Sequence, residues 1–310
     1  MTRAADSFAY TYDPAGNVLT RSYPGVGPAS YGYDDDGRLA SVTRSTQATT
    51  YFYDEAAELI RTALPNATRQ TRSYDRAGRL SEVRNERLLD PLPPVALSVA
   101  RYGYDPVGNP TTITRDGGTE LDSYDTLDRL TEVCYAAASS CGPLDPFIRY
   151  GYDAVGNRTA ETRPSGTTSY SYDSGDELLS RTGPSGTVAY SYDQNGNETA
   201  AGTRSFAYDL ADRLTSTTDA GTTTTDAYDG DGTRLEAVSG SSTTKFLWDD
   251  NLALPELALE RDGSGSAIRS YLHGAEPISF DSGGQSFYLH TDGIGSVVGV
   301  TSASGTPQWS

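Results

Sequence analysis

Only one pair of side chains in this sequence is spaced for acid–base catalysis. His290 and Asp292 lie two residues apart in a glycine-rich stretch, and a histidine titrates near neutral pH. The sequence holds no Gly-x-Ser-x-Gly elbow and no nucleophile tied to this pair by its spacing. We therefore favour a structural hydrogen bond for His290, and we predict no catalytic residue and no enzymatic activity.

Two short acidic motifs imitate known sites. The Asp-Gly-Asp-Gly run that starts at Asp229 resembles a calcium loop, but Gly240 stands where the loop needs its bidentate glutamate. The Asp-Ser-Gly triplets at Asp173 and Asp281 resemble those of aspartic proteases, which need two facing loops. Strand turns explain these motifs better. With no phosphate-binding glycine loop present, we predict no cofactor.

The two cysteines are close in sequence. Cys134 and Cys141 lie in one irregular insertion, and a local disulfide is our preferred interpretation, with two free thiols as the alternative. Only His273 and His290 could complete a zinc site, and both lie far along the chain. We therefore predict no metal site.

A tyrosine–aspartate pair recurs along most of the chain and sets its architecture. The pattern Tyr-x-Tyr-Asp-x-x-Gly-(Arg/Asn)-Leu returns about every 20 residues, and Trp248-Asp249 forms a variant copy. The pairs begin at residues 12, 33, 53, 74, 104, 124, 152, 172, 192, 208 and 228. Other residues replace the glycine at Ala57, Asp128, Asp176 and Asp212.

Each position of the repeat has a physical role in a β-hairpin. Tyrosines at i and i+2 point to one face of a strand, where they can stack on those of neighbouring copies. The aspartate suits a strand end because it can accept hydrogen bonds from amides two residues on, and the glycine can take the positive φ of the turn. The structural residues we predict include Tyr12, Asp13, Gly16, Tyr33, Asp34, Gly37, Tyr104, Asp105, Gly108, Tyr152, Asp153, Gly156, Tyr192, Asp193 and Gly196.

The repeat predicts an all-β fold of tandem hairpins in a curved or spiralling antiparallel sheet. We predict surface loops at 84–100 and 134–147, where the connections are long. After Lys245 the rhythm changes, so we divide the chain into a repeat array over 1–245 and a second region, continuous with the sheet, over 246–310. The array is about 115 Å wide at the usual strand spacing, which predicts an open portion of a larger structure.

Charge excludes several classes of partner. The net charge is −18, and Lys245 is the one lysine, so nucleic acid and anionic membranes would be repelled. No stretch approaches the roughly 20 apolar residues of a membrane span, and we predict no membrane insertion. Because the repeat begins close to Met1, we expect a segment cut from something longer.

These repeats resemble the bacterial Rhs or YD-repeat proteins, which are related in repeat type to animal teneurins. The resemblance covers about residues 8–240, and the segment from His290 to Ser296 resembles the opening of the Rhs repeat-associated core. The resemblance therefore implies that residues 246–310 are the N-terminal part of that core. It implies a β-sheet that spirals into a hollow shell around a variable C-terminal toxin. In the family the core cleaves the toxin free with aspartates near its end. The cleavage segment and the toxin are absent before Ser310, so neither activity is carried over.

The resemblance implies a structural role, as a segment of an Rhs-type shell that encapsulates and delivers a toxin in the full-length parent. Its partners would be the remaining shell segments and the enclosed toxin, at a secreted or cell-surface location. The alternative is an extracellular module whose tyrosine rows bind carbohydrate or a cell-surface protein.

Overall fold

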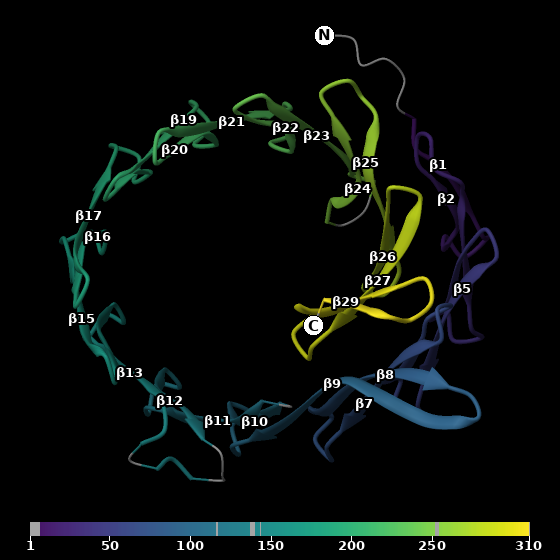
Figure 1. Ribbon diagram of the computed structural model, residues 1–310, viewed down its shortest axis with the longest axis horizontal. Helices are drawn as coiled ribbons and strands as arrows, with labels where there is room; N and C mark the ends of the chain where they lie inside the picture. Colours follow the sequence, from purple (N-terminus) through teal and green to yellow (C-terminus); the bar gives the residue numbers. More distant parts are fainter. Residues whose placement is uncertain (1–6, 116, 137–139, 143, 252–253, 310) are drawn as a thin grey trace. The chain divides into compact units, whose positions relative to one another are not determined.

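The computed structural model describes residues 7–115, 117–136, 140–142, 144–251 and 254–309, and these form an all-β fold (Figure 1). Within them lie 29 strands of one antiparallel sheet, so the predicted fold class is confirmed. In the same ranges no helix is long and apolar enough to cross a bilayer.

The strands follow the chain as a series of hairpins. The first group comprises β1 (Ala9–Tyr12), β2 (Val18–Ser22), β3 (Ala29–Tyr33), β4 (Leu39–Arg44), β5 (Gln47–Tyr53), β6 (Leu59–Ala63), β7 (Thr68–Tyr74), β8 (Leu80–Leu89) and β9 (Leu92–Tyr104). The middle group comprises β10 (Pro110–Arg115), β11 (Gly118–Tyr124), β12 (Leu130–Ala136), β13 (Phe147–Tyr152), β14 (Arg158–Arg163), β15 (Gly166–Tyr172), β16 (Leu178–Gly183), β17 (Gly186–Tyr192), β18 (Glu198–Ala201), β19 (Arg204–Tyr208), β20 (Leu214–Asp219), β21 (Thr222–Tyr228), β22 (Arg234–Ser239) and β23 (Ser242–Asp249). The last group comprises β24 (Glu256–Asp262), β25 (Ala267–His273), β26 (Pro277–Ser282), β27 (Gln285–Thr291), β28 (Val297–Ser302) and β29 (Pro307–Trp309).

Consecutive strands pair, and the pairing register shifts by one residue at those tyrosine–aspartate turns for which the structure describes the register. In the β3–β4 hairpin, for example, the shift falls between Gly32 and Tyr33. The same shift occurs between Gly151 and Tyr152 in the β13–β14 hairpin. These shifts are β-bulges, which place one extra residue on the return strand and increase the local twist.

The chain divides into two compact units. Unit 1 comprises Met1–Arg101 and Phe246–Ser310, and unit 2 comprises Tyr102–Lys245. The sequence therefore leaves unit 1 in the middle of β9 and returns to it within β23. The sequence-based division at 245/246 into a repeat array and a second region stays a prediction.

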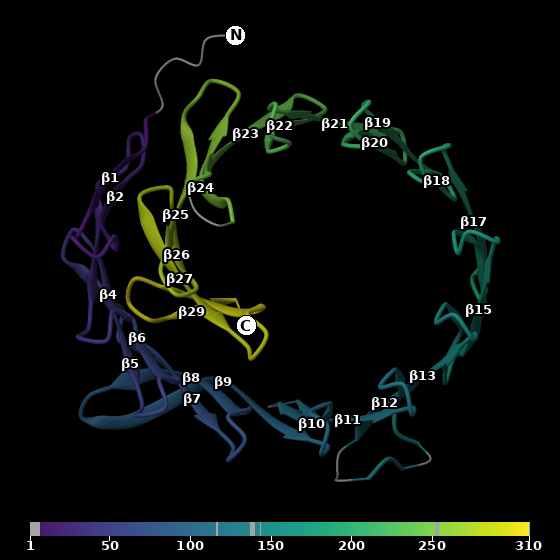
Figure 2. The same cartoon turned by 180° about the vertical axis from the view of Figure 1, so that it is seen from behind.

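Unit 1 has two layers, because β24–β29 lie against β1–β8 (Figures 1 and 2). The apolar core between them joins Tyr31, Val42 and Tyr51 of the first layer to Leu272 and Ile278 of the second. A smaller cluster joins Tyr23 to Ala258 and Leu259. The burial of these apolar side chains holds the second layer on the first.

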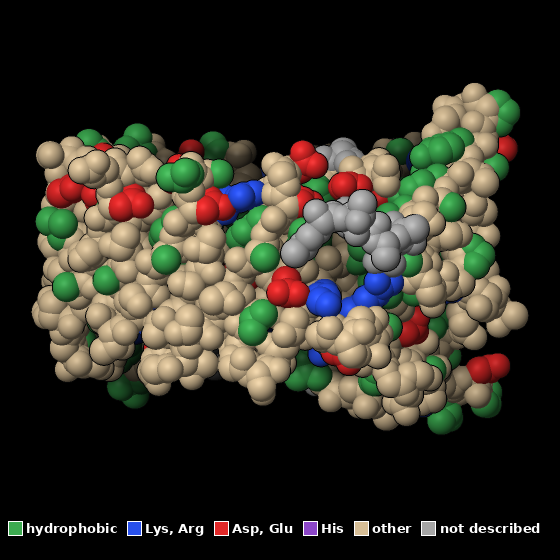
Figure 3. Space-filling view, turned by 90° about the horizontal axis from the view of Figure 1, so that it is seen from above, with side chains coloured by type: hydrophobic (Ala, Val, Ile, Leu, Met, Phe, Trp, Pro, Cys, Tyr) green, Lys and Arg blue, Asp and Glu red, His purple; other side chains and the backbone are tan. Residues whose placement is uncertain are grey.

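Unit 2 is a single layer of hairpins that follows an arc in Figure 1. On the left of Figure 3, where this unit faces the viewer, acidic side chains lie in a row near the upper rim. The surface below that row carries mostly neutral side chains.

One predicted loop is wrong. Apart from the turn at 90–91, residues 84–100 belong to β8 and β9, which pair from Glu82 with Arg101 out to Leu89 with Leu92. The prolines in this segment suggested a loop, but exposed edge strands tolerate proline, because its missing N–H would face solvent there. The other predicted loop, at 134–147, has no strand between Ala136 and Phe147 in its described residues.

Candidate functional site: the repeated tyrosine–aspartate turn

The aspartate of each repeat closes its own turn. Oδ1 of Asp34 accepts hydrogen bonds from the amides of Asp36 and Arg38, at 3.1 and 2.8 Å. Oδ2 accepts a hydrogen bond from Nε of Arg38 at 2.7 Å. The amide two residues on was predicted, whereas the bonds to the fourth residue were not. In the equivalent turn at Asp75, the hydrogen bond from Arg79 holds the pKa of the carboxyl below its usual range.

The turn keeps a residue with a left-handed backbone conformation even in the copies that lack the glycine. Gly156 has a φ of +106°, in the region that glycine adopts without strain. The four positions where the sequence replaces this glycine also have positive φ, at 65°, 58°, 64° and 57° for Ala57, Asp128, Asp176 and Asp212. Three of these four are aspartates, which tolerate this conformation better than most residues. The turn geometry is therefore retained across the replacements.

The second tyrosine of the motif joins each copy to the one before it. In Tyr53 the hydroxyl donates a hydrogen bond to the carbonyl of Leu39 at 2.9 Å, and Leu39 starts the previous return strand. The same bond recurs for Tyr33, Tyr74, Tyr124, Tyr152, Tyr172, Tyr192 and Tyr228, at 2.7 to 3.1 Å. We name this series the hydroxyl ladder. Sequence reasoning expected ring stacking between copies, but in these copies the hydroxyl makes the link.

Arginine at the end of the turn strengthens the same link. The guanidinium of Arg38 is bound to Asp34 and lies 4.9 Å from the ring centroid of Tyr53 in the next copy. Arg129 lies 4.8 Å from the ring centroid of Tyr152 in the same way. A cation over an aromatic face is attractive, so one arginine serves two copies. The tyrosine hydroxyl and the arginine of the motif thus contact a neighbouring copy, whereas the aspartate binds within its own turn.

The catalytic interpretation of His290 and Asp292 finds no support. His290 is 2% exposed, and its Nε2 lies 2.9 Å from Oγ1 of Thr301. Burial lowers the pKa of His290 to about 4. Asp292 instead accepts the amides of Ile294 and Ser296, as other turn aspartates do. The structural hydrogen bond that the sequence favoured is present.

The remaining acidic motifs have structural partners as well. Asp229 accepts the amides of Asp231 and Thr233, and Asp173 closes the turn of its repeat. Asp281 lies within hydrogen-bonding reach of Ser270 and 3.4 Å from a guanidinium nitrogen of Arg44 in the other layer of unit 1.

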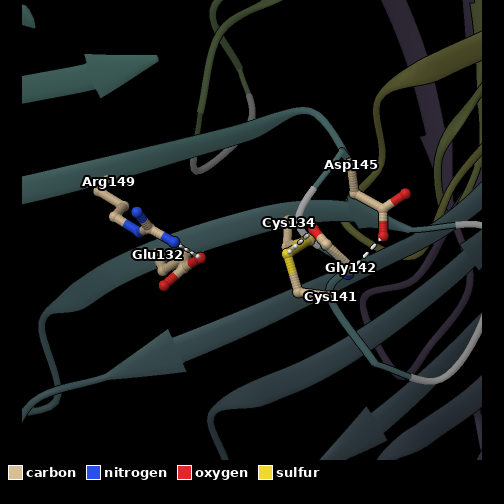
Figure 4. The surroundings of a disulfide bond; sticks show 6 residues. All are labelled: Glu132, Cys134, Cys141, Gly142, Asp145 and Arg149. Carbon is tan, nitrogen blue, oxygen red and sulfur yellow. Dashed lines mark hydrogen bonds and ion pairs between the residues drawn. A yellow bond between two sulfur atoms is a disulfide. The ribbon is translucent and has the colours of Figure 1, made fainter. Parts of the chain in front are cut away.

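The structure joins Cys134 and Cys141 as a disulfide with sulfur atoms 2.00 Å apart (Figure 4). Asp145 lies close enough to form a ligand cluster with them, the one such group found among the described residues. Sulfur atoms in a disulfide are not thiolates, so this cluster does not suit a metal ion. Oxidation of the pair in the protein as produced stays a prediction.

Sequence reasoning missed the polar contacts between the layers of unit 1. Asp249, in the variant repeat copy, is fully buried, accepts a hydrogen bond from Tyr10 and pairs with Arg21. Gln70 donates to the backbone carbonyl of Thr291 at 2.9 Å. The sequence did offer one signal for these contacts, because polar residues stand at inward-facing positions of the repeat. Examples are Gln70, Arg72 and Asn85.

Comparison with known proteins identifies the repeat. The family described as Teneurin YD-shell matches residues 2–86 and 123–308. The unmatched residues 87–122 include the outer part of the β8–β9 hairpin. No curated protein sequence matches the chain significantly.

Solved structures share this fold. The Photorhabdus luminescens Tc holotoxin pore, with a mutation in TccC3, is 19% identical over 97% of the chain, with a TM-score of 0.66. The crystal structure of TcdB2-TccC3 is 17% identical over 97% of the chain, also with a TM-score of 0.66. The chain spans only 17% and 18% of the length of these two structures.

Proposed function

Because the chain belongs to the Teneurin YD-shell family, we propose that it is a non-enzymatic structural segment of an Rhs-type shell. In a longer, secreted or cell-surface parent, this shell would encapsulate and deliver a C-terminal toxin. The partners of the segment would then be further shell segments and the enclosed toxin domain.

The hydroxyl ladder is the observation that carries this proposal. It uses a side chain of the motif in copy after copy to tie one hairpin to the next. The carboxylate oxygens of the turn aspartates likewise accept hydrogen bonds from amides of their own turns. Bonds that join neighbouring hairpins in this way support a structural role for the motif.

Carbohydrate or cell-surface binding by the tyrosine rows is a weaker candidate. A sugar stacks on the open face of an aromatic ring. In unit 2 the guanidinium of Arg158 lies 4.6 Å from the ring centroid of Tyr170 and 5.6 Å from that of Tyr150. These arginine contacts occupy part of the surface that a sugar would need.

Scattering tests whether the isolated chain is a shell segment. Among the described strands, β1 pairs with β2 and β29 with β28, which leaves each end strand with one unpaired edge. Such edges recruit further strands. We expect light and small-angle X-ray scattering to show concentration-dependent association. A compact monomer with an internal cavity at all concentrations would contradict the proposal.

Protease protection tests encapsulation in the longer protein that carries this segment. The toxin domain should resist a protease while the shell is folded and become sensitive once the shell is denatured. Digestion of the toxin at the rate of the free domain would show that the shell does not enclose it.

A further inference from the structure

The two units expose the same face of the repeat to different degrees. We call the side of the sheet that holds the first tyrosine of each copy the tyrosine face. In unit 1 the second layer covers this face, and Tyr31 and Tyr51 are 7% and 6% exposed. In unit 2 the equivalent Tyr170 and Tyr190 are only partly buried.

Arginines pair with carboxylates across the covered face. Arg21 contacts Glu256 at 2.6 Å and Asp249 at 3.6 Å. Arg72 contacts Glu276 at 2.6 Å. In these pairs the arginine lies on the first layer and the carboxylate comes from the C-terminal part of unit 1, from β23 for Asp249 and from the second layer for Glu256 and Glu276.

On the same face of unit 2, Asp226 pairs with Arg234 at 2.5 Å and Glu161 with Arg163 at 2.7 Å, whereas two other arginines lack such a partner among the described residues. Arg181 lies opposite Tyr170 in the register, as Arg21 lies opposite Tyr10. Arg204 precedes its turn aspartate by five residues, as Gln70 does in unit 1. Both arginines are exposed, and no carboxylate of the described residues forms an ion pair with either.

We infer that the tyrosine face of unit 2 is a docking surface for a second β-layer that presents carboxylates to Arg181 and Arg204. The layer would come from another segment of the shell, so the inference rests on the proposed function. The precedent for such a layer lies in unit 1, where residues 246–309 of this chain cover the tyrosine face of the first layer. The net charge of −18 opposes an acidic partner at long range, so recognition would depend on short-range pairing with these two exposed arginines, as in the contact of Arg21 with Glu256.

The opposite face of unit 2 is unsuited to the same partner. Its side chains are small and neutral along β15–β17, and their hydroxyls bond to each other, as in Ser171 with Ser180 and Thr182 with Thr187. Hydroxyls that are already paired offer little to carboxylates. Arg149, paired with Glu132 at 3.1 Å, lies opposite Thr162 on this face and provides a control position (Figure 4).

A peptide of residues 255–273, which covers β24 and β25, is the probe for this surface. Fluorescence anisotropy of the labelled peptide should show saturable, salt-sensitive binding to the full chain. Reversing both charges, with Arg181→Glu and Arg204→Glu, should weaken binding roughly tenfold because attraction becomes repulsion. Arg149→Glu reverses one charge on the opposite face and should leave binding unchanged, so it shows whether the effect depends on the position of the reversed charge.

Three outcomes would overturn the inference: no binding to the parent chain, equal binding to the Arg181→Glu/Arg204→Glu variant, or an equal loss in Arg149→Glu. A peptide whose Glu256 and Glu260 are replaced by Gln should bind the parent chain more weakly than the parent peptide does, but by less than the tenfold loss expected from charge reversal, because it loses attraction without gaining repulsion. None of these results depends on scattering or protease protection, so the proposed shell role can stand if this inference fails.

Discussion

Units 1 and 2 are built from the same repeat, yet they bury it differently. In unit 1 the tyrosine face is the inner side of a two-layer packing, with Val42 and Leu259 almost fully buried. In unit 2 the same face has one layer, and stability comes from contacts between neighbouring hairpins. The same repeat therefore occurs as a single layer in unit 2 and under a second layer in unit 1, where apolar burial and polar contacts join the two layers.

We expect the largest effect at the variant repeat copy, Trp248-Asp249. Replacing the fully buried Asp249 by alanine removes the acceptor of Tyr10 and one of the two charge partners of Arg21. Because Arg21 keeps Glu256, we expect the free energy of unfolding of unit 1 to fall by about 3 kcal/mol, the lower end of the range for a broken buried pair. The matched change Asp193→Ala in unit 2 removes exposed turn bonds and should cost only about 1 kcal/mol. Hydrogen exchange of residues 246–309 would measure the first effect, and equal losses would contradict the comparison.

Acid should lower the free energy of unfolding of unit 1 before that of unit 2, because the buried His290 belongs to unit 1. Its pKa is about 4 in the folded chain against 6.5 ordinarily, so the unfolded state binds the proton more readily between these values. Stability should thus fall as the pH drops from 6.5 to 4, by up to about 3 kcal/mol. Urea titrations of the parent and of His290→Gln across this range would check it, because the variant should lack this slope.

The turns should respond alike in both units, because they lie at the strand ends and outside the layer contact. Gly156→Val and Gly37→Val each force a β-branched residue into positive φ, and each should destabilise the chain by about 2 kcal/mol. Ala57→Gly should do the reverse and stabilise by about 1 kcal/mol. Thermal unfolding of the three variants measures these shifts. Unchanged stability in both valine variants would refute the turn assignment.

The disulfide should matter least. It closes a short loop in an insertion of unit 2, so its reduction should cost less than about 2 kcal/mol and leave unit 1 unaffected. Mass spectrometry of unreduced peptides should show Cys134 and Cys141 linked, two hydrogens lighter than the thiols. Complete labelling by a thiol reagent under native conditions would rule out the bridge.

The hairpins and their turns could be predicted from the sequence, whereas the second layer of unit 1 could not. The spacing of Tyr33, Asp34 and Gly37 carries the hairpin and its turn, because strand alternation and turn chemistry act within a few residues. The pairing of Arg21 with Asp249 joins positions far apart in sequence, and no local pattern specifies such a contact. The prolines near Leu92 led us to predict a loop where the structure has strands. Proline usually interrupts a strand, but an exposed edge of a sheet tolerates it.

The hydroxyl ladder also makes the length of the array adjustable. Tyr53, Tyr124 and Tyr172 each reach a carbonyl 14 residues earlier, so every bond is specified by its own neighbourhood. Duplicating or deleting one whole copy in the gene adds or removes two strands, and each remaining tyrosine still finds the same kind of acceptor. Recombination between copies could therefore lengthen or shorten the wall in steps of about 10 Å without a change of register elsewhere.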